Sequence, residues 1–327
     1  MEMKRGFIQK GGPAMKNARK TMLLNFKDGS LTSQALRYFA KVTLHNSLPV
    51  FPALISFSCE AVGGSAEKTT PFGEAFVLIS SGADLHDDVI DQSVIKGSKQ
   101  TVLGKFNAAT AILAGDILLV QGFKQLNDAS ELISNKQAKE ILELVFNAVF
   151  EICSAETLEI QLRNKLDLTP DEYYEVIRLK AVVPEVAMKI GALIGNGNSN
   201  DVESLGQFGR IYGVNSIIID EFADLFDIEE LSNRLKNECP PLPILYCLQN
   251  PKIKTNLMPL LGVDLIDKKT HKKIVKTVLG SSEIQTLEKI LVSNATSEQE
   301  HLSKKINKKI REELVNLLLV PLNYLEI

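Results

Sequence analysis

Two short segments of the chain carry aspartates at helical spacing, and both segments lie inside apolar sequence. The first reads Asp87-Asp88-Val89-Ile90-Asp91 and follows the apolar run 76–79. On a helix, Asp87 and Asp91 share a face, one turn apart, with Asp88 beside them. Two carboxylates about 5 Å apart repel by roughly 3 kcal/mol at an effective dielectric of 20, and no Lys or Arg at helical spacing offsets this repulsion. Mg²⁺, which prefers oxygen ligands, is the natural counter-ion.

The second segment, 217–227, places three aspartates at i, i+4 and i+7, which is a continuous stripe on a helix: Asp220, Asp224 and Asp227. Two acidic helices embedded in core-like sequence are expected to form facing walls of one cavity. Several Mg²⁺ ions, and through them a diphosphate, could bind between such walls. A solvated acidic face is the plainer interpretation of each segment, but such a face would have polar flanks as well.

The elements that carry these side chains are predicted to be helices. No proline occurs between Pro71 and Pro170, and apolar residues recur there at spacings of three and four, which is the helical period. The pattern at 169–172 reads as a helix start, and Pro184 is expected to kink the helix that contains it. The predicted helices cover residues 32–45, 51–62, 68–92, 106–127, 136–165, 171–195, 201–227, 241–250, 269–279 and 283–324.

The predicted organisation is one all-α domain over residues 31–327, preceded by a basic, flexible N-terminal arm over residues 1–30. The chain has 327 residues, 45% of them hydrophobic, which suffices for a packed core. Its net charge of −3 gives no global attraction to nucleic acid. No apolar run reaches the roughly twenty residues that a membrane helix needs, and residues 1–20 do not read as a signal peptide. We therefore expect a cytoplasmic protein without nucleic-acid binding or stable membrane insertion.

Together with Leu113-Ala114-Gly115-Asp116, the first acidic segment resembles the first aspartate-rich region of the trans-type polyprenyl (isoprenyl) diphosphate synthases. Lys180, followed by Gly213 and the segment 220–224, resembles that family's diphosphate-binding lysine and second aspartate-rich motif. The resemblance covers residues 30–325, with family-like spacing throughout. It implies an isoprenoid-synthase-type helical bundle around a deep central cavity, usually in a dimer.

The same resemblance implies a reaction and the residues that perform it. Family members ionise an allylic isoprenoid diphosphate held by Mg²⁺, and isopentenyl diphosphate then attacks the carbocation, which lengthens the chain by one isoprene unit. Lys180 would neutralise the leaving diphosphate and, with the first three aspartates, make up the catalytic set. The alternative for Lys180 is a solvent lysine near a helix start. The implied metal ligands are Asp87, Asp88, Asp91, Asp220 and Asp224, with Asp227 a further candidate.

The sequence departs from the family pattern mainly where isopentenyl diphosphate would bind. Of the family's Gly-Lys-Arg-x-Arg-Pro stretch, the matching residues 47–52 keep only a proline, and a later family lysine aligns with Cys239. A diphosphate carries about three negative charges, and losing three or four contacts of roughly 1.5–3 kcal/mol each would weaken binding by several orders of magnitude. The Arg-Arg-Gly that follows the first motif in the family becomes Ile95-Lys96-Gly97. The candidate replacement cations are Lys96, Lys99 and Lys236.

Three functions are therefore open. The first is a Mg²⁺-dependent prenyltransferase that condenses an allylic prenyl diphosphate with isopentenyl diphosphate at a degraded site. The second is a synthase-like subunit without independent activity, paired with a complete homologue. The third is a terpene-cyclase-like enzyme, which needs only the metal-binding site for the allylic diphosphate. A homodimer, or a heteromer with a homologous synthase, is expected.

The resemblance also implies two substrate contacts beyond the catalytic set. Lys96 is expected to contact a diphosphate. Gly82, five residues before Asp87, is expected to line the floor beneath the growing chain, and close helix packing is the alternative for this glycine.

Overall fold

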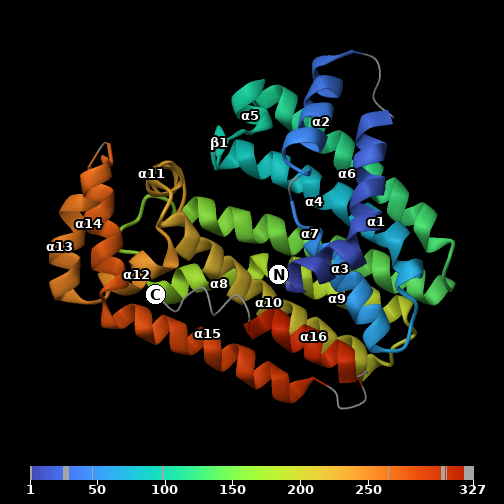
Figure 1. The fold of residues 1–327 in the computed structure, drawn as a ribbon. Coiled ribbons are helices and arrows are strands. Elements are labelled where there is room, and N and C mark those ends of the chain that lie inside the picture. The colour runs from blue at the N-terminus through green and yellow to red at the C-terminus, as the bar shows by residue number, and fades with distance from the viewer. Residues whose placement is uncertain are drawn as a thin grey trace. The chain divides into compact units, whose positions relative to one another are not determined.

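The computed structural model describes residues 2–24, 29–45, 47–97, 99–263, 265–302, 306 and 308–319. Within these ranges nearly every regular element is a helix, as Figure 1 shows, and the strands form a two-stranded hairpin. The prediction of an all-α fold class is confirmed. The chain divides into two compact units, and each is described by itself.

The first unit comprises residues 1–148, 183–209 and 302–314. Three helices have residues in both units: α7 (Asn135–Leu162), α10 (Ser199–Asp224) and α16 (Lys308–Leu319). The other elements of this unit are α1 (Glu2–Leu24), α2 (Leu31–Val42), α3 (Val50–Ala61), the 3₁₀ helix η1 (Ala66–Thr69), α4 (Thr70–Ile90), β1 (Ile95–Lys96), β2 (Lys99–Gln100), α5 (Val102–Lys105), α6 (Ala108–Ser130) and nearly all of α9 (Val182–Ile194).

Close packing of α4 against α6 forms the centre of this unit, with Leu78, Leu85 and Leu118 completely buried. Glycines allow the two backbones to approach. A Cβ atom on Gly82 would lie 2.8 Å from the Gly115 carbonyl oxygen and 2.8 Å from a side-chain carbon of α6, well inside van der Waals contact. Gly82 therefore packs against α6, as the alternative interpretation from the sequence expects, and its role in lining a substrate cavity stays a prediction.

Residues 2–24, predicted as part of a flexible arm, instead form α1, which packs against α3 and α4. Phe7, Ala14, Ala18 and Met22 are buried, and their spacing places them along one helical face. This apolar face is hard to see in the sequence because exposed basic residues surround it. A Cβ atom on Gly11 would lie only 2.3 Å from the carbonyl oxygen of Pro49, so α1 lies directly on the start of α3.

The second unit comprises residues 149–182, 210–301 and 315–327. Its own helices are α8 (Pro170–Lys180), α11 (Ile228–Asn237), α12 (Leu242–Leu248), α13 (Pro251–Leu261), α14 (Lys268–Leu279) and α15 (Ser282–His301). The short apolar helix α12 contacts α8, α13, α14 and α15, and its residues Leu242, Ile244 and Leu245 are completely buried. No helix among the described residues is long and apolar enough to cross a membrane.

The helix predicted over 171–195 is two helices. Thr169 and Glu172 form a capping box at the start of α8, as the sequence indicates. The chain leaves the helical conformation at Ala181 (ψ 0°), and α9 begins at the next residue. Pro184 consequently lies in the first turn of α9, where its missing N–H costs no hydrogen bond. The interruption therefore lies one turn before this proline, where the clash of a proline ring with the carbonyl four residues earlier disturbs a helix, and it is a full break rather than a kink within one helix.

Candidate active site

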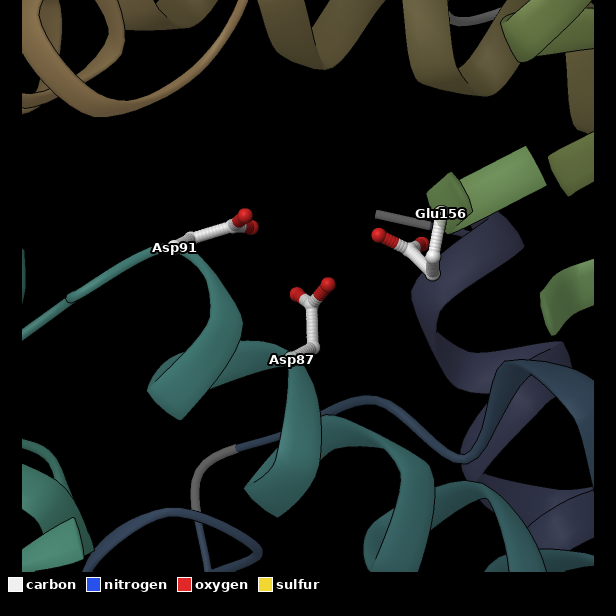
Figure 2. Close-up of side chains that lie close together, drawn as sticks. All are labelled: Asp87, Asp91 and Glu156. Atoms are coloured by element: carbon white, nitrogen blue, oxygen red, sulfur yellow. The ribbon is translucent and has the colours of Figure 1, made fainter. Parts of the chain in front are cut away.

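The first acidic segment forms the C-terminal turn of α4. Asp91 caps the helix, with its backbone N–H donating to the Asp87 carbonyl at 2.8 Å. Figure 2 shows the carboxylates of Asp87 and Asp91 pointing into the same space beside the end of α4, where an oxygen of each lies within 4.8 Å of the other. Asp88 and Asp91 are buried. Asp87 and Asp91 therefore converge at one helix end, and the role of these three aspartates as metal ligands stays a prediction.

A lysine that the spacing argument missed lies beside these carboxylates. Lys96 Nζ is 2.8 Å from Asp88, 3.5 Å from Asp84 and 3.8 Å from Asp87. It reaches them because β1 and β2 turn back at Gly97, which has φ +61°, a conformation suited to glycine. Although desolvation opposes it, the charge of Asp84, Asp88 and Asp87 raises the pKa of Lys96 well above its ordinary value. No Lys or Arg lies at helical spacing, as expected, but Lys96 from the hairpin offsets part of the repulsion.

One lysine does not neutralise this group of carboxylates. Burial raises the pKa of Asp88 from 3.8 to about 6, and the nearby Asp84 and Asp87 add to this effect, although Lys96 opposes it. The surplus of negative charge and the oxygen-only donor set both fit a hard divalent cation such as Mg²⁺. Asp87 and Asp91 are close enough to share a metal ion.

The second acidic segment ends α10, and it surrounds a buried arginine from α11. Arg234, 6% exposed, donates to Asp224 Oδ2 at 2.9 Å and to Glu221 Oε1 at 3.0 Å. Glu221, 2% exposed, also accepts from the Tyr173 hydroxyl at 2.6 Å and from the Leu242 backbone N–H at 2.7 Å. These hydrogen bonds therefore hold the carboxylates of Glu221 and Asp224 in fixed positions.

Asp220 differs from its neighbours because it has no cationic partner among the described residues. Desolvation, together with the charges of Asp224 and Glu221, raises its pKa from 3.8 to about 6, although the residue itself is exposed. The stripe that the sequence predicts does not extend to Asp227. Because α10 ends at Asp224, Asp227 caps α11 and accepts from the backbone N–H groups of Glu229 and Glu230 at 2.9 and 3.2 Å.

Lys180, the last residue of α8, lies between two carboxylates of α7. Its Nζ is 2.9 Å from Glu156 and 2.5 Å from Glu159, so it is not a solvent lysine. Glu159 is buried, and its backbone carbonyl lies 3.8 Å from the Cys239 thiol. Burial raises the pKa of Cys239 to about 12. This thiol therefore stays protonated and does not replace the missing family lysine.

The stretch 47–52, which in the resemblance corresponds to the basic segment that binds isopentenyl diphosphate, leads into α3 and forms its first residues. Pro49 is buried beneath α1, and the Phe51 ring packs against Phe76 at 5.8 Å between centroids. This stretch contains no Lys or Arg, so it offers no cation to a phosphate.

The residues that sequence reasoning missed are the partners of these groups. Arg234 stands on α11, a polar helix that the apolar pattern does not reveal, since only Leu231 and Arg234 of its ten residues are buried. Glu156 and Glu159 are three apart on α7, and that spacing was the available signal that both carboxylates share a face.

The fold is all-α, and at the end of α4 the carboxylates of Asp87 and Asp91 are close enough to hold a divalent cation. The family model for polyprenyl synthetase matches residues 42–278. The chain therefore belongs to the polyprenyl synthetase family, and the resemblance seen in its motifs is confirmed.

Curated relatives and solved structures agree with this assignment. The chain is 32% identical over 182 residues to a short chain isoprenyl diphosphate synthase of Methanothermobacter thermautotrophicus, a match that covers 55% of this chain and 54% of the relative. It is 28% identical over 232 residues to a geranylgeranyl diphosphate synthase of Sulfolobus acidocaldarius, covering 70% and 67%. The match to the first of these relatives spans only about half of its length. The fold matches geranylgeranyl pyrophosphate synthetase from Pyrococcus horikoshii with a TM-score of 0.85 and 23% identity over 98% of both chains.

Proposed function

We propose that this chain is a Mg²⁺-dependent prenyltransferase of isoprenoid biosynthesis, which joins an allylic prenyl diphosphate to isopentenyl diphosphate. The observation that carries the proposal is the group of carboxylates at the end of α4, where an oxygen of Asp87 and one of Asp91 lie within 4.8 Å of each other and Asp88 is buried. The end of α10 carries a second acidic group, Asp220 and Asp224. Ionised carboxylates that lie close together repel one another and destabilise the fold, unless a bound cation offsets the repulsion. Family membership supplies the ligand class.

The proposed metal-binding set consists of carboxylates from both helix ends. When bound, Mg²⁺ would neutralise the charge that develops on the departing diphosphate. Arg234 holds Glu221 and Asp224 in place. Glu156 and Glu159 hold the Lys180 ammonium in one position, from which we propose that it contacts the diphosphate. The metal ligands in this proposal are Asp87, Asp88, Asp91, Asp220 and Asp224.

We propose that isopentenyl diphosphate binds weakly to the isolated chain. In support, residues 47–52 contain no Lys or Arg, Cys239 is buried, and Lys96 is engaged by carboxylates. Lys99 is close to the Val42 carbonyl, at 3.3 Å. The second candidate function follows from the same observation: a cytoplasmic synthase-like subunit whose homologous partner supplies the isopentenyl diphosphate site.

A product assay separates these possibilities. The purified chain is incubated with Mg²⁺, radiolabelled isopentenyl diphosphate and geranyl, farnesyl or geranylgeranyl diphosphate, with and without a homologue that has an intact cationic grip. Elongated prenyl diphosphate from the chain alone, lost with EDTA and in Asp88→Asn, supports the transferase. Product that exceeds the homologue's own output only when both are present supports the subunit. Conversion of the allylic diphosphate without isopentenyl diphosphate would indicate the cyclase-like alternative.

The proposed weak binding of isopentenyl diphosphate can also be measured directly, without catalysis. Isopentenyl diphosphate alone should bind this chain with a Kd above about 100 µM by calorimetry, since several contacts of roughly 1.5–3 kcal/mol each are missing. Micromolar binding without a partner would show that lysines elsewhere, such as Lys96 or Lys236, form a replacement site.

A further inference from the structure

One face of α14 carries a group of lysines that the proposed reaction does not use. The helix has the sequence KKTHKKIVKTVL, and five lysines line one shallow depression at its surface: Lys268, Lys269, Lys272, Lys273 and Lys276. All five are exposed. We name this group the α14 lysine face. Figure 1 shows α14 beside α13, and the two helices are in contact.

The geometry of α14 separates these lysines from the core. At 3.6 residues per turn, the five lysines span an arc of about 140°, with Ile274 and Val278 on the opposite side. Those two residues are completely buried. The helix is thus anchored in its unit by one side, and the whole opposite side presents ammonium groups.

Among the described residues, the carboxylate that interacts with this face is that of Asp267, which attracts Lys269 and supplies one negative charge against five lysines. No Asp or Glu occurs between Lys268 and Ser282, and none of the five lysines forms an ion pair with a residue in the described part of the chain. The preceding acid, Asp267, is turned to the helix backbone, where it accepts from the Thr270 N–H at 2.7 Å. Because the whole chain has a net charge of −3, removing these five positive charges leaves −8 on the rest. The positive charge is therefore concentrated locally.

Exposed apolar side chains adjoin the lysine face. In the turn between α13 and α14, Leu265 is 81% exposed and Val263 is 41% exposed. Leu265 stands three residues before the first lysine of the helix. A phosphate-rich nucleic acid offers nothing to a solvated leucine, whereas a lipid bilayer offers anionic headgroups to lysines and an apolar interior to Leu265.

We propose that the α14 lysine face, together with Leu265 and Val263, docks the protein reversibly on membranes that contain anionic lipids. Lysines near such a surface each strengthen binding, and a few exposed apolar side chains add insertion at the headgroup level. The inference goes beyond the proposed function and stands without it, because it rests on charge and exposure in α14 and in the turn that precedes it. Five lysines with one leucine predict peripheral attachment that salt reverses.

Vesicle co-sedimentation of the full chain tests the inference. The protein should bind vesicles of 40% phosphatidylglycerol and 60% phosphatidylcholine at 100 mM salt. It should bind far less to pure phosphatidylcholine vesicles at the same salt concentration, and far less to the mixed vesicles at 500 mM salt. Lys269→Gln/Lys272→Gln/Lys273→Gln should lower the partition coefficient roughly a hundredfold. Leu265→Ser should lower it by a smaller factor that salt does not change.

The matched control is Lys124→Gln/Lys136→Gln/Lys139→Gln, which removes the same charge from exposed lysines of α6 and α7. It should bind vesicles within twofold of the wild type, and both triple variants should keep the wild-type melting temperature. Equal loss in the two variants, or no binding to the anionic vesicles, would overturn the inference. Binding to a 30-base-pair duplex that depends on the α14 lysines, without vesicle binding, would overturn it in favour of a nucleic-acid surface.

Discussion

At the scale of single residues, this chain places carboxylates where an ionised group is costly. Asp88 is 4% exposed and shares one lysine with Asp84 and Asp87. Glu221 is buried as well, but it has three donors, including Arg234. The difference between these two carboxylates is chemical: Glu221 is already satisfied by the protein, whereas Asp88 has spare capacity for a cation.

The cost at Asp88 should appear as a pH-dependent stability. Because its pKa is raised from 3.8 to about 6 by burial, the folded protein binds this proton more tightly than the unfolded chain does. The metal-free fold therefore gains stability as the pH falls from about 6 towards 4. Asp88→Asn should raise the free energy of unfolding by on the order of 2 kcal/mol at pH 8 and by little at pH 4.

Urea unfolding in EDTA at the two pH values measures this effect. Asp128→Asn, an exposed carboxylate paired with Lys124 at 2.6 Å, serves as the control and should change stability by less than about 0.5 kcal/mol at either pH. A destabilised Asp88→Asn at pH 8 would mean that the Lys96 ion pair outweighs the cost of burial.

Arg234 should be a structural requirement of the second helix end. Arg234→Met leaves Glu221 buried and partly unpaired, which should destabilise the protein by about 3–5 kcal/mol. Adding Glu221→Gln to that variant should restore a large part of the loss, because the uncompensated charge is gone. Additive losses in the double variant, measured by urea unfolding, would show that the two side chains act independently.

At the scale of elements, both acidic segments stand at the C-terminal ends of their helices. Asp91 caps α4, and α10 ends at Asp224. The helix dipole makes such ends unfavourable for carboxylates, which adds to the case for a cation there. The sequence pattern was sufficient to predict helices carrying these aspartates. It could not predict the hairpin that returns Lys96 to α4, because that contact depends on a turn at Gly97 and not on helical spacing.

The contact of α4 with α6 gives a direct test of the role of Gly82. Gly82→Ala places a methyl group 2.8 Å from the Gly115 carbonyl oxygen, so it should destabilise the protein by about 1–3 kcal/mol. Gly6→Ala, in the interior of α1, where the added Cβ atom would meet only Phe57 at an ordinary 3.5 Å, should be neutral or stabilising by up to about 1 kcal/mol. A neutral Gly82→Ala in thermal unfolding would contradict the packing role and favour the substrate contact instead.

At the scale of the whole molecule, the sequence was sufficient for the fold class and for the family, because both depend on patterns that repeat along the chain. Apolar spacing predicts most helices, and the two aspartate-rich motifs with Lys180 carry the resemblance. Contacts between residues far apart in the sequence leave no such repeating pattern. The pairing of Arg234 with Glu221, or of Lys180 with Glu159, depends on packing that brings residues together over 13 and 21 positions.

The central claim is that both acidic helix ends bind Mg²⁺ together with an allylic diphosphate. The most direct measurement is the melting temperature with Mg²⁺ and a non-ionising allylic thiodiphosphate, since a ligand at a hundred times its Kd stabilises the native state by about 2.7 kcal/mol. We predict a rise of several degrees for the wild type and for Asp128→Asn, a reduced rise for Asp88→Asn and for Asp224→Asn, and none for the double variant. An undiminished rise in the double variant would contradict the metal assignment at both helix ends.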